Sequence, residues 1–317
     1  MAAALSGANT LAPRRRRGNP SSGRGWRSPA YLFLLPGFAV FSLVMIYPTV
    51  QALIMSLEKW SPAPGVENTF VGLANYAKAF GDPIFWRAMA NSGVYTAVTV
   101  PGQIVLGLIC AVALNRALAG RTAFRIMVYI PVITSWVVVS VLFKYLFATD
   151  GGLVNWLLAD ATSLMDQGVD WYNGRWTAMV AICGLGIWKG VGWTMLIFLA
   201  ALQAVPESLY EAACVDGAQG WQQFWHITLP SIRRTTLFIT IMLVIGAFNV
   251  FVSVQLTTNG GPANLTQVPL TYLYRQAFNF LDFGYGSAIA FMLTALIFAL
   301  SIGQYSLGSK SAQDAAA

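Results

Sequence analysis

Six long apolar runs form the main pattern along this chain, and shorter polar segments separate them. Each run has about 20 residues or more, the length that an α-helix needs to cross a bilayer. The runs are continuously apolar rather than alternating, so they predict helices and not the strands of a membrane barrel. They cover residues 31–57, 88–115, 126–147, 177–203, 235–256 and 285–307. The expected fold is an all-α integral membrane protein with six transmembrane helices.

The first run is unusually long, because residues 31–57 would extend about 40 Å as a straight helix. We expect it to tilt or kink, with Pro36 and Pro48 as break points. The alternative is a cleaved secretory signal, but its apolar core has roughly 7–15 residues, and no small-residue cleavage site follows this run. A retained first helix fits better.

Composition and charge set the compartment and the topology. Of the 317 residues, 56% are hydrophobic and 10% are charged, and the mean hydropathy is +0.60. Soluble domains carry about 25% charged residues, so the excess apolar surface of this chain is expected to face lipid. Six arginines lie between residues 14 and 27, and others lie in 116–125 and 233–234, so the positive-inside rule places both termini in the cytosol of a multi-pass plasma-membrane protein. Topology and anionic lipid account for this charge, so no nucleic-acid partner is expected.

Three parts follow from these patterns. Residues 1–28 are expected to form a disordered basic cytosolic tail. Residues 29–309 are expected to form the transmembrane domain, and 310–317 a C-terminal tail. A polar cytosolic insert, residues 204–234, separates the fourth and fifth runs.

Candidate chemistry in the chain is sparse. The three cysteines show no metal-ligand spacing, and His226 is the only histidine, so no disulfide or metal site is expected. No lysine follows a glycine, as the phosphate-binding loop of an ATPase requires. Every Asp and Glu falls outside the predicted helix cores, which leaves an intramembrane enzyme little support. We expect a chain that is not an enzyme and binds no cofactor.

The insert is expected to form two short helices. Pro206 and Glu207 suit a first helical turn, and Gly217 can end that helix through a positive φ or allow another backbone to approach closely. Apolar faces are expected at Leu209, Ala212 and Ala213, and at Trp221, Phe224 and Trp225. Such a segment either docks on a protein or lies on the lipid surface. Because 207–225 contains no Lys or Arg, docking is slightly favoured.

The insert also carries a motif. Glu211-Ala212-Ala213, three residues, Gly217, nine residues and Ile227-Thr228-Leu229-Pro230 together resemble the EAA signature of ABC-importer permeases. The tracts 205–218, 256–262 and 283–288 are similar to the carbohydrate-importing subfamily of the maltose and glycerol-phosphate kind. The resemblance covers nearly the whole chain from about residue 30.

The resemblance implies a function and a set of partners. The insert would dock on an ATPase subunit, with Glu211 and Asp216 as electrostatic contacts, Ala212, Ala213 and Gly217 in close packing, and Ile227, Leu229 and Pro230 as the rigid return. The solute would be a sugar or sugar-like molecule. Expected partners are a second permease subunit, two ATPase subunits that hold ATP and Mg, an extracytoplasmic binding protein and the bilayer.

Polar and aromatic groups within the runs are candidates for the solute path. Lys189 lies about 18 Å along the fourth run, near the middle of the bilayer. Asn249 and Gln103 lie at similar depth, and Trp188 and Trp193 could stack on a sugar. Alternatively, Lys189 pairs with a partner or a carbonyl, while Asn249 and Gln103 join helices. A permease for a non-carbohydrate solute, a scaffold and a membrane enzyme remain the alternative functions.

Overall fold

The computed structural model describes residues 29–65, 67–115, 120–162 and 168–314. The expected tail 1–28 lies outside these residues. The chain divides into two compact units, the first ending at Val50 and the second beginning at Gln51, and each is described by itself.

The helix expected from the first apolar run begins in the first unit and continues past Val50. Helix α1 (Pro29–Phe41) leads through a π-helical turn, η1 (Ser42–Ile46), into α2 (Tyr47–Ser56). The N–H of Tyr47 donates to the carbonyl of Ser42, five residues back. This irregular turn ends two residues before Pro48, which has no N–H to donate, whereas α1 continues past Pro36.

The second unit contains the helices that cover the other five apolar runs. These are α4 (Pro83–Asn115), α5 (Arg121–Ile133), α6 (Trp136–Leu146), α8 (Arg175–Gln203), α12 (Arg233–Phe248), α13 (Val252–Thr257) and α15 (Phe283–Asp314). Among the described residues of the whole chain, five helices are long and apolar enough to cross a membrane, and a bent pair makes a sixth span if it counts as one. The all-helical expectation is therefore confirmed. The boundary expected at residue 310 falls inside α15.

The expectation of one continuous helix over 126–147 is wrong. Helices α5 and α6 bend by 97° at a two-residue break. Thr134 is extended, with φ −71° and ψ 144°, and Ser135 caps α6 by accepting a hydrogen bond from the N–H of Val137. Pro131 has no N–H to extend the regular ladder of α5. Hydropathy is continuous across this point, so the apolar pattern alone could not show the break.

The fifth run, 235–256, is also interrupted. Helix α12 ends at Phe248, and α13 begins at Val252. Phe251 between them has φ −139° and ψ −65°. The break places an asparagine, Asn249, at a helix end.

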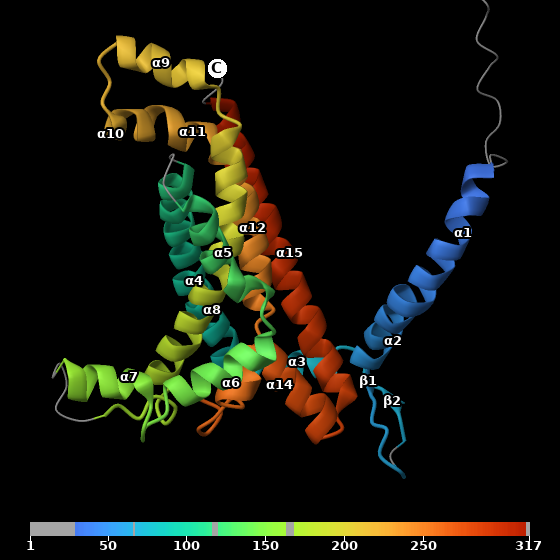
Figure 1. Cartoon of the computed structure of the whole chain (residues 1–317). Helices are drawn as coiled ribbons and strands as arrows, with labels where there is room; N and C mark the ends of the chain where they lie inside the picture. The colour runs from blue at the N-terminus through green and yellow to red at the C-terminus, as the bar shows by residue number, and fades with distance from the viewer. Residues whose placement is uncertain (1–28, 66, 116–119, 163–167, 315–317) are drawn as a thin grey trace, which may run out of the picture. The chain divides into compact units, whose positions relative to one another are not determined.

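Helix α8 packs along α4 in the bundle (Figure 1). Small residues permit this contact, because a Cβ on Gly186 would collide with Tyr95 and one on Gly190 would collide with Gln103. The apolar core continues to one end of the bundle, where Phe198 and Leu202 of α8 pack with Ile232 before α12.

Shorter elements lie at the two ends of the second unit (Figure 1). At one end the insert forms α9 (Glu207–Val215), α10 (Gly220–Gln223), η3 (Phe224–Thr228) and α11 (Leu229–Ser231). At the other end lie β1 (Glu58–Lys59), β2 (Thr69–Phe70), α3 (Ala74–Phe80), α7 (Leu153–Asn155), η2 (Trp156–Ala161), α14 (Pro269–Tyr274) and η4 (Arg275–Asn279). Strands β1 and β2 pair antiparallel, with Glu58 opposite Phe70.

A polar cluster joins α3, α4, α14 and α15 at this second end. The carboxylate of Asp82 accepts hydrogen bonds from Tyr272 and, at 2.7 Å, from Tyr285. Lys78 forms an ion pair with Asp282 at 2.8 Å. Burial raises the pKa of Asp82, but the two tyrosine hydroxyls and backbone N–H groups outweigh that effect and leave the pKa below its ordinary value of 3.8. Asp82 and Asp282 therefore both have partners within the chain.

Candidate functional site

The first helix of the insert ends in a defined left-handed turn. Gly217 has φ +77°, and nothing lies within 4 Å of a Cβ built on it. The N–H of Gly217 donates to the carbonyl of Cys214 at 3.1 Å, and that of Ala218 to Ala213 at 2.8 Å, which is a Schellman motif. Backbone conformation, rather than crowding within this chain, therefore favours glycine here.

Helix α9 presents its side chains to the outside. Within its described residues none is buried, and Val215 is 89% exposed. Glu211, Ala212 and Asp216 are exposed as well. Neither acid forms an ion pair with any described residue of the chain. The surface combines small residues, an exposed valine and free carboxylates, which is suited to close contact with a partner that supplies basic groups.

The insert has two legs, α9 and the segment from α10 to α11, and hydrogen bonds join them. The hydroxyls of Tyr210 and Thr228 lie 3.0 Å apart and share a hydrogen bond. The side-chain amide of Gln223 donates to the carbonyl of Ala218 at 3.0 Å. Trp221 and Trp225 contact edge to face, with ring centroids 5.6 Å apart. Because the two hydrogen bonds join the second leg to α9 and to the turn after it, and the tryptophan pair stiffens the second leg, the insert can move as one piece.

The return into the bundle runs through Ile227, Leu229 and Pro230. Pro230 lies inside α11, which continues to Ser231. Its ring is tolerated because it stands in the first turn after the π-helical segment η3. The next residue, Ile232, is 1% exposed and packs with Leu202 at the end of α8. Both ends of the insert are thus anchored in one cluster.

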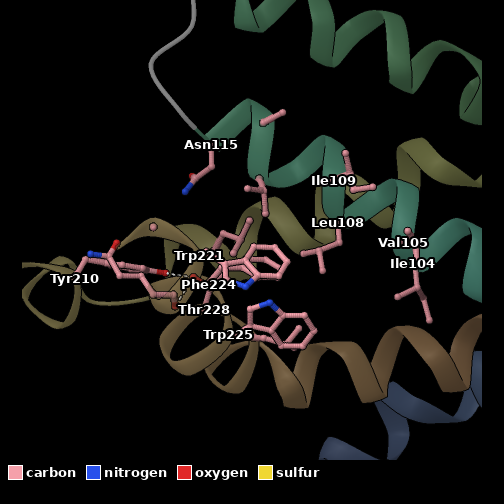
Figure 2. Close-up of a pocket in the computed structure, with 16 residues that line it drawn as sticks. Ile104, Val105, Leu108, Ile109, Asn115, Tyr210, Trp221, Phe224, Trp225 and Thr228 are labelled. Carbon is pink, nitrogen blue, oxygen red and sulfur yellow. Dashed lines mark hydrogen bonds between the residues drawn. The ribbon is translucent and has the colours of Figure 1, made fainter. Parts of the chain in front are cut away.

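A cavity of about 940 Å³ lies between the insert and α4. Figure 2 shows the rings of Trp221, Phe224 and Trp225 near Leu108 and Ile109 of α4. Tyr210 and Thr228, which tie the legs together, also line it. The cavity is largely apolar and offers few groups that could orient a polar solute.

Lys189 is enclosed at the break between α5 and α6. Its side chain is 4% exposed, and Nζ donates to the carbonyls of Pro131 at 2.8 Å and Thr134 at 2.6 Å. Nζ also lies 4.8 Å from the ring centroid of Trp136. The carbonyls at the end of α5 have no helical partner, so the ammonium satisfies them. This is the carbonyl pairing considered above as the alternative to a path-lining role.

The other path candidates differ in exposure. Gln103 is 8% exposed and donates to the carbonyl of Gly186 at 3.2 Å, which joins α4 to α8. Trp193 is half-buried against the core. Trp188 is 45% exposed, and its ring lies 5.6 Å from that of Phe143.

Asn249 is exposed at the end of α12. Its side-chain N–H₂ donates to the carbonyl of Ile245 at 2.8 Å. The amide oxygen accepts no hydrogen bond from another described residue. Of the five candidates, Asn249 and Trp188 alone are exposed, so the structure does not gather the five around one cavity.

The sequence did not show which carbonyls hold Lys189, and it gave no sign of the Asp82 cluster. The carbonyls of Pro131 and Thr134 hold Lys189, and the pair Thr134-Ser135 after Pro131 was a local signal for a helix break and a new N-cap. The Asp82 cluster joins residues about 200 positions apart, and no local pattern marks it.

A membrane helix bundle that carries an exposed, internally hydrogen-bonded insert has the architecture of a transport permease. Residues 103–311 match the family described as "Binding-protein-dependent transport system inner membrane component", and the chain belongs to this family. It is the permease subunit of an ABC importer, a non-catalytic multi-pass component of the plasma membrane that works in a complex with a binding protein.

Individual relatives agree with the family. A probable ABC transporter permease of Bacillus subtilis is 36% identical over 276 residues, covering 86% of this chain and 94% of the relative. The lactose transport system permease of Rhizobium radiobacter is 34% identical and covers 87% and 92%. A subunit of a bacterial alginate ABC transporter, crystallised with a periplasmic protein bound to an alginate pentasaccharide, has the same fold, with a TM-score of 0.78, 21% identity and coverage of 89% and 94%.

Proposed function

We propose that this permease imports a sugar or oligosaccharide delivered by an extracytoplasmic binding protein. Two observations support this solute class. One relative is a lactose transport permease, and three tracts are similar to the carbohydrate-importing subfamily, namely 205–218, 256–262 and 283–288. A second permease subunit and two ATPase subunits complete the proposed assembly, and the ATPases hold ATP and Mg. Both termini and the insert lie in the cytosol in this proposal, in agreement with the arginines of 116–125 and 233–234.

Coupling of this chain to ATP hydrolysis is supported by the insert, whose legs are hydrogen-bonded together and whose exposed acids have no ion-pair partner among the described residues. We propose that α9 docks in a groove of an ATPase subunit, where Glu211 meets basic groups and Ala212, Ala213 and Gly217 permit close packing. Closure of the ATPases on ATP would then move the insert as one piece. Since Leu202 and Ile232 pack together, that motion would reach α8 and α12, and the coupling would depend on different contacts in two states.

For the solute path, we propose that Asn249 and Trp188 are the contributing side chains. Asn249 offers an amide at a helix break and Trp188 an exposed ring for stacking on a sugar face. Lys189 then fixes the angle between α5 and α6, and Gln103 and Trp193 hold the surrounding helices. In this proposal the enclosed side chains set the positions of the helices around the path, and the exposed side chains contact the solute.

The test of docking is co-purification of the complex from native membranes. Glu211→Lys is expected to lose the ATPase subunits, because it places a cation where a carboxylate meets basic groups. Glu207→Lys, on the first turn of the same helix, is the matched control and is expected to keep them. Retention of the ATPases by Glu211→Lys at the unsubstituted level would overturn the docking role.

A further inference from the structure

A second cavity, here called the outer polar pocket, lies between α13 and the α14–η4 segment. Its volume is about 250 Å³, and the side chains lining it all carry polar groups. Helix α14 is at the end of the bundle opposite the insert (Figure 1). The pocket is therefore on the extracytoplasmic side in the proposed topology.

The floor of the pocket is fixed by hydrogen bonds. Gln267 is 1% exposed and Thr271 is 2% exposed. The hydroxyl of Thr271 donates to Oε1 of Gln267 at 2.6 Å, and Nε2 of Gln267 donates to Oδ1 of Asn264 at 3.4 Å. A Cβ on Gly260, whose φ is +76°, would collide with the amide of Gln267. The backbone turn thus holds a buried amide in place.

The rim of the pocket has unused hydrogen-bonding groups. Across the described part of the chain, the side-chain amide of Asn279 and the hydroxyl of Tyr274 have no hydrogen-bond partner. Arg275 uses one guanidinium nitrogen on Asn264 and lies 5.4 Å from the ring centroid of Phe280. No acidic side chain lines the pocket. A ligand here would meet several free donors and a single positive charge.

We propose that the outer polar pocket binds one saccharide unit of the solute as it passes from the binding protein to the bundle. Vicinal hydroxyls need paired donors and acceptors at fixed spacing, which amides and a guanidinium supply. Tyr274, 38% exposed, offers a ring edge or face beside them. The volume is below the roughly 300–1,000 Å³ of sites for larger ligands, so a single ring fits the pocket better than a chain.

This inference rests on the proposed import of a sugar and adds a site to it. The test uses the assembled transporter in nanodiscs, with lactose as a neutral probe and an alginate trisaccharide as an acidic one. Saturation-transfer NMR measures binding of each probe. Asn279→Leu is the test variant, and Asn173→Leu, at an exposed asparagine of another loop on the same side, is the matched control.

Loss of one hydrogen-bonding group is expected to weaken probe binding about tenfold in Asn279→Leu and to leave Asn173→Leu unchanged. Equal binding by both variants would overturn the pocket assignment. Weaker binding of the binding protein with unchanged probe binding would also overturn it, because the pocket would then receive a protein segment. Sugar uptake by the unsubstituted transporter is scored separately, and its absence for a sugar panel would overturn the proposed function itself.

Discussion

Two acids at one end of the helix bundle and two in the insert at the other end are in opposite environments. At the end formed by α3 and α14, Asp82 accepts from two tyrosines and Asp282 pairs with Lys78. At the insert, Glu211 and Asp216 are exposed, and the described residues give them no ion-pair partner. Asp82 and Asp282 thus have partners within the chain, whereas Glu211 and Asp216 are available to another subunit.

The largest effect is expected from Gly217→Asp. The chain has space for the side chain, so the protein should reach the membrane, but the positive φ and the added charge would disturb the docking surface. Uptake of the transported sugar is expected to be abolished at normal membrane levels. Gly151→Asp is the control, because Gly151 also has a positive φ, +70°, with nothing near its Cβ, and lies at the opposite end. Normal transport by Gly217→Asp would show that the glycine has no role in docking.

Lys189→Ala is expected to have the next largest effect. It leaves the carbonyls of Pro131 and Thr134 without their donor, at a cost of about 1.5–3 kcal/mol for a charged hydrogen bond. Uptake should fall while the ATPase subunits still co-purify. Lys144→Ala, at an exposed lysine of α6, should change neither. Loss of the ATPases from Lys189→Ala would mean that the break supports the whole bundle rather than the path.

Asp82→Asn tests the end of the bundle where the carboxylate accepts hydrogen bonds from two tyrosines. The amide cannot accept two hydroxyl donors as strongly as a carboxylate, so the free energy of unfolding should fall by about 1–3 kcal/mol. Thermal unfolding in detergent measures this loss, and ATPase recruitment should be unchanged. Glu211→Gln is the comparison at the other end and should leave the unfolding temperature unaltered. An equal loss of stability in both variants would contradict the distinction between the ends.

The pH dependence of stability gives a smaller effect. The pKa of Asp82 is lowered in the folded chain because hydrogen bonds outweigh burial, so its stabilisation is present above the ordinary value of 3.8 and is lost as pH falls through the lower folded pKa. Unfolding temperatures should therefore decrease more steeply below about pH 4 in the unsubstituted protein than in Asp82→Asn. Parallel curves for the two proteins would exclude this contribution.

Tyr210→Phe is expected to have the smallest effect. It removes the hydrogen bond to Thr228 that ties the two legs, worth about 0.5–1.5 kcal/mol. The ATPases should remain bound, but sugar transported per ATP hydrolysed should fall because the insert moves less as one piece. An unchanged ratio of transport to hydrolysis would show that the tie is dispensable for coupling.

The sequence predicted the elements whose cause is local. Continuous apolar runs predicted the long helices, and the glycine at 217 predicted a helix end with positive φ. It did not predict the 97° bend between α5 and α6, because hydropathy does not record hydrogen bonding at Thr134 and Ser135. The Asp82 cluster and the carbonyls around Lys189 depend on which helices become neighbours. A single sequence contains no local signal for that placement.

The most direct test of the docking claim is photo-crosslinking from α9. p-Benzoylphenylalanine replaces Val215, which is 89% exposed, and in a control replaces Tyr145 of α6, which is 72% exposed. The assembled transporter is irradiated in native membranes, and crosslinked peptides are identified by mass spectrometry. If α9 docks on an ATPase subunit, we expect crosslinks from position 215 to that subunit and none to it from position 145. Crosslinks from position 215 to lipid alone would contradict docking and return the insert to the membrane surface.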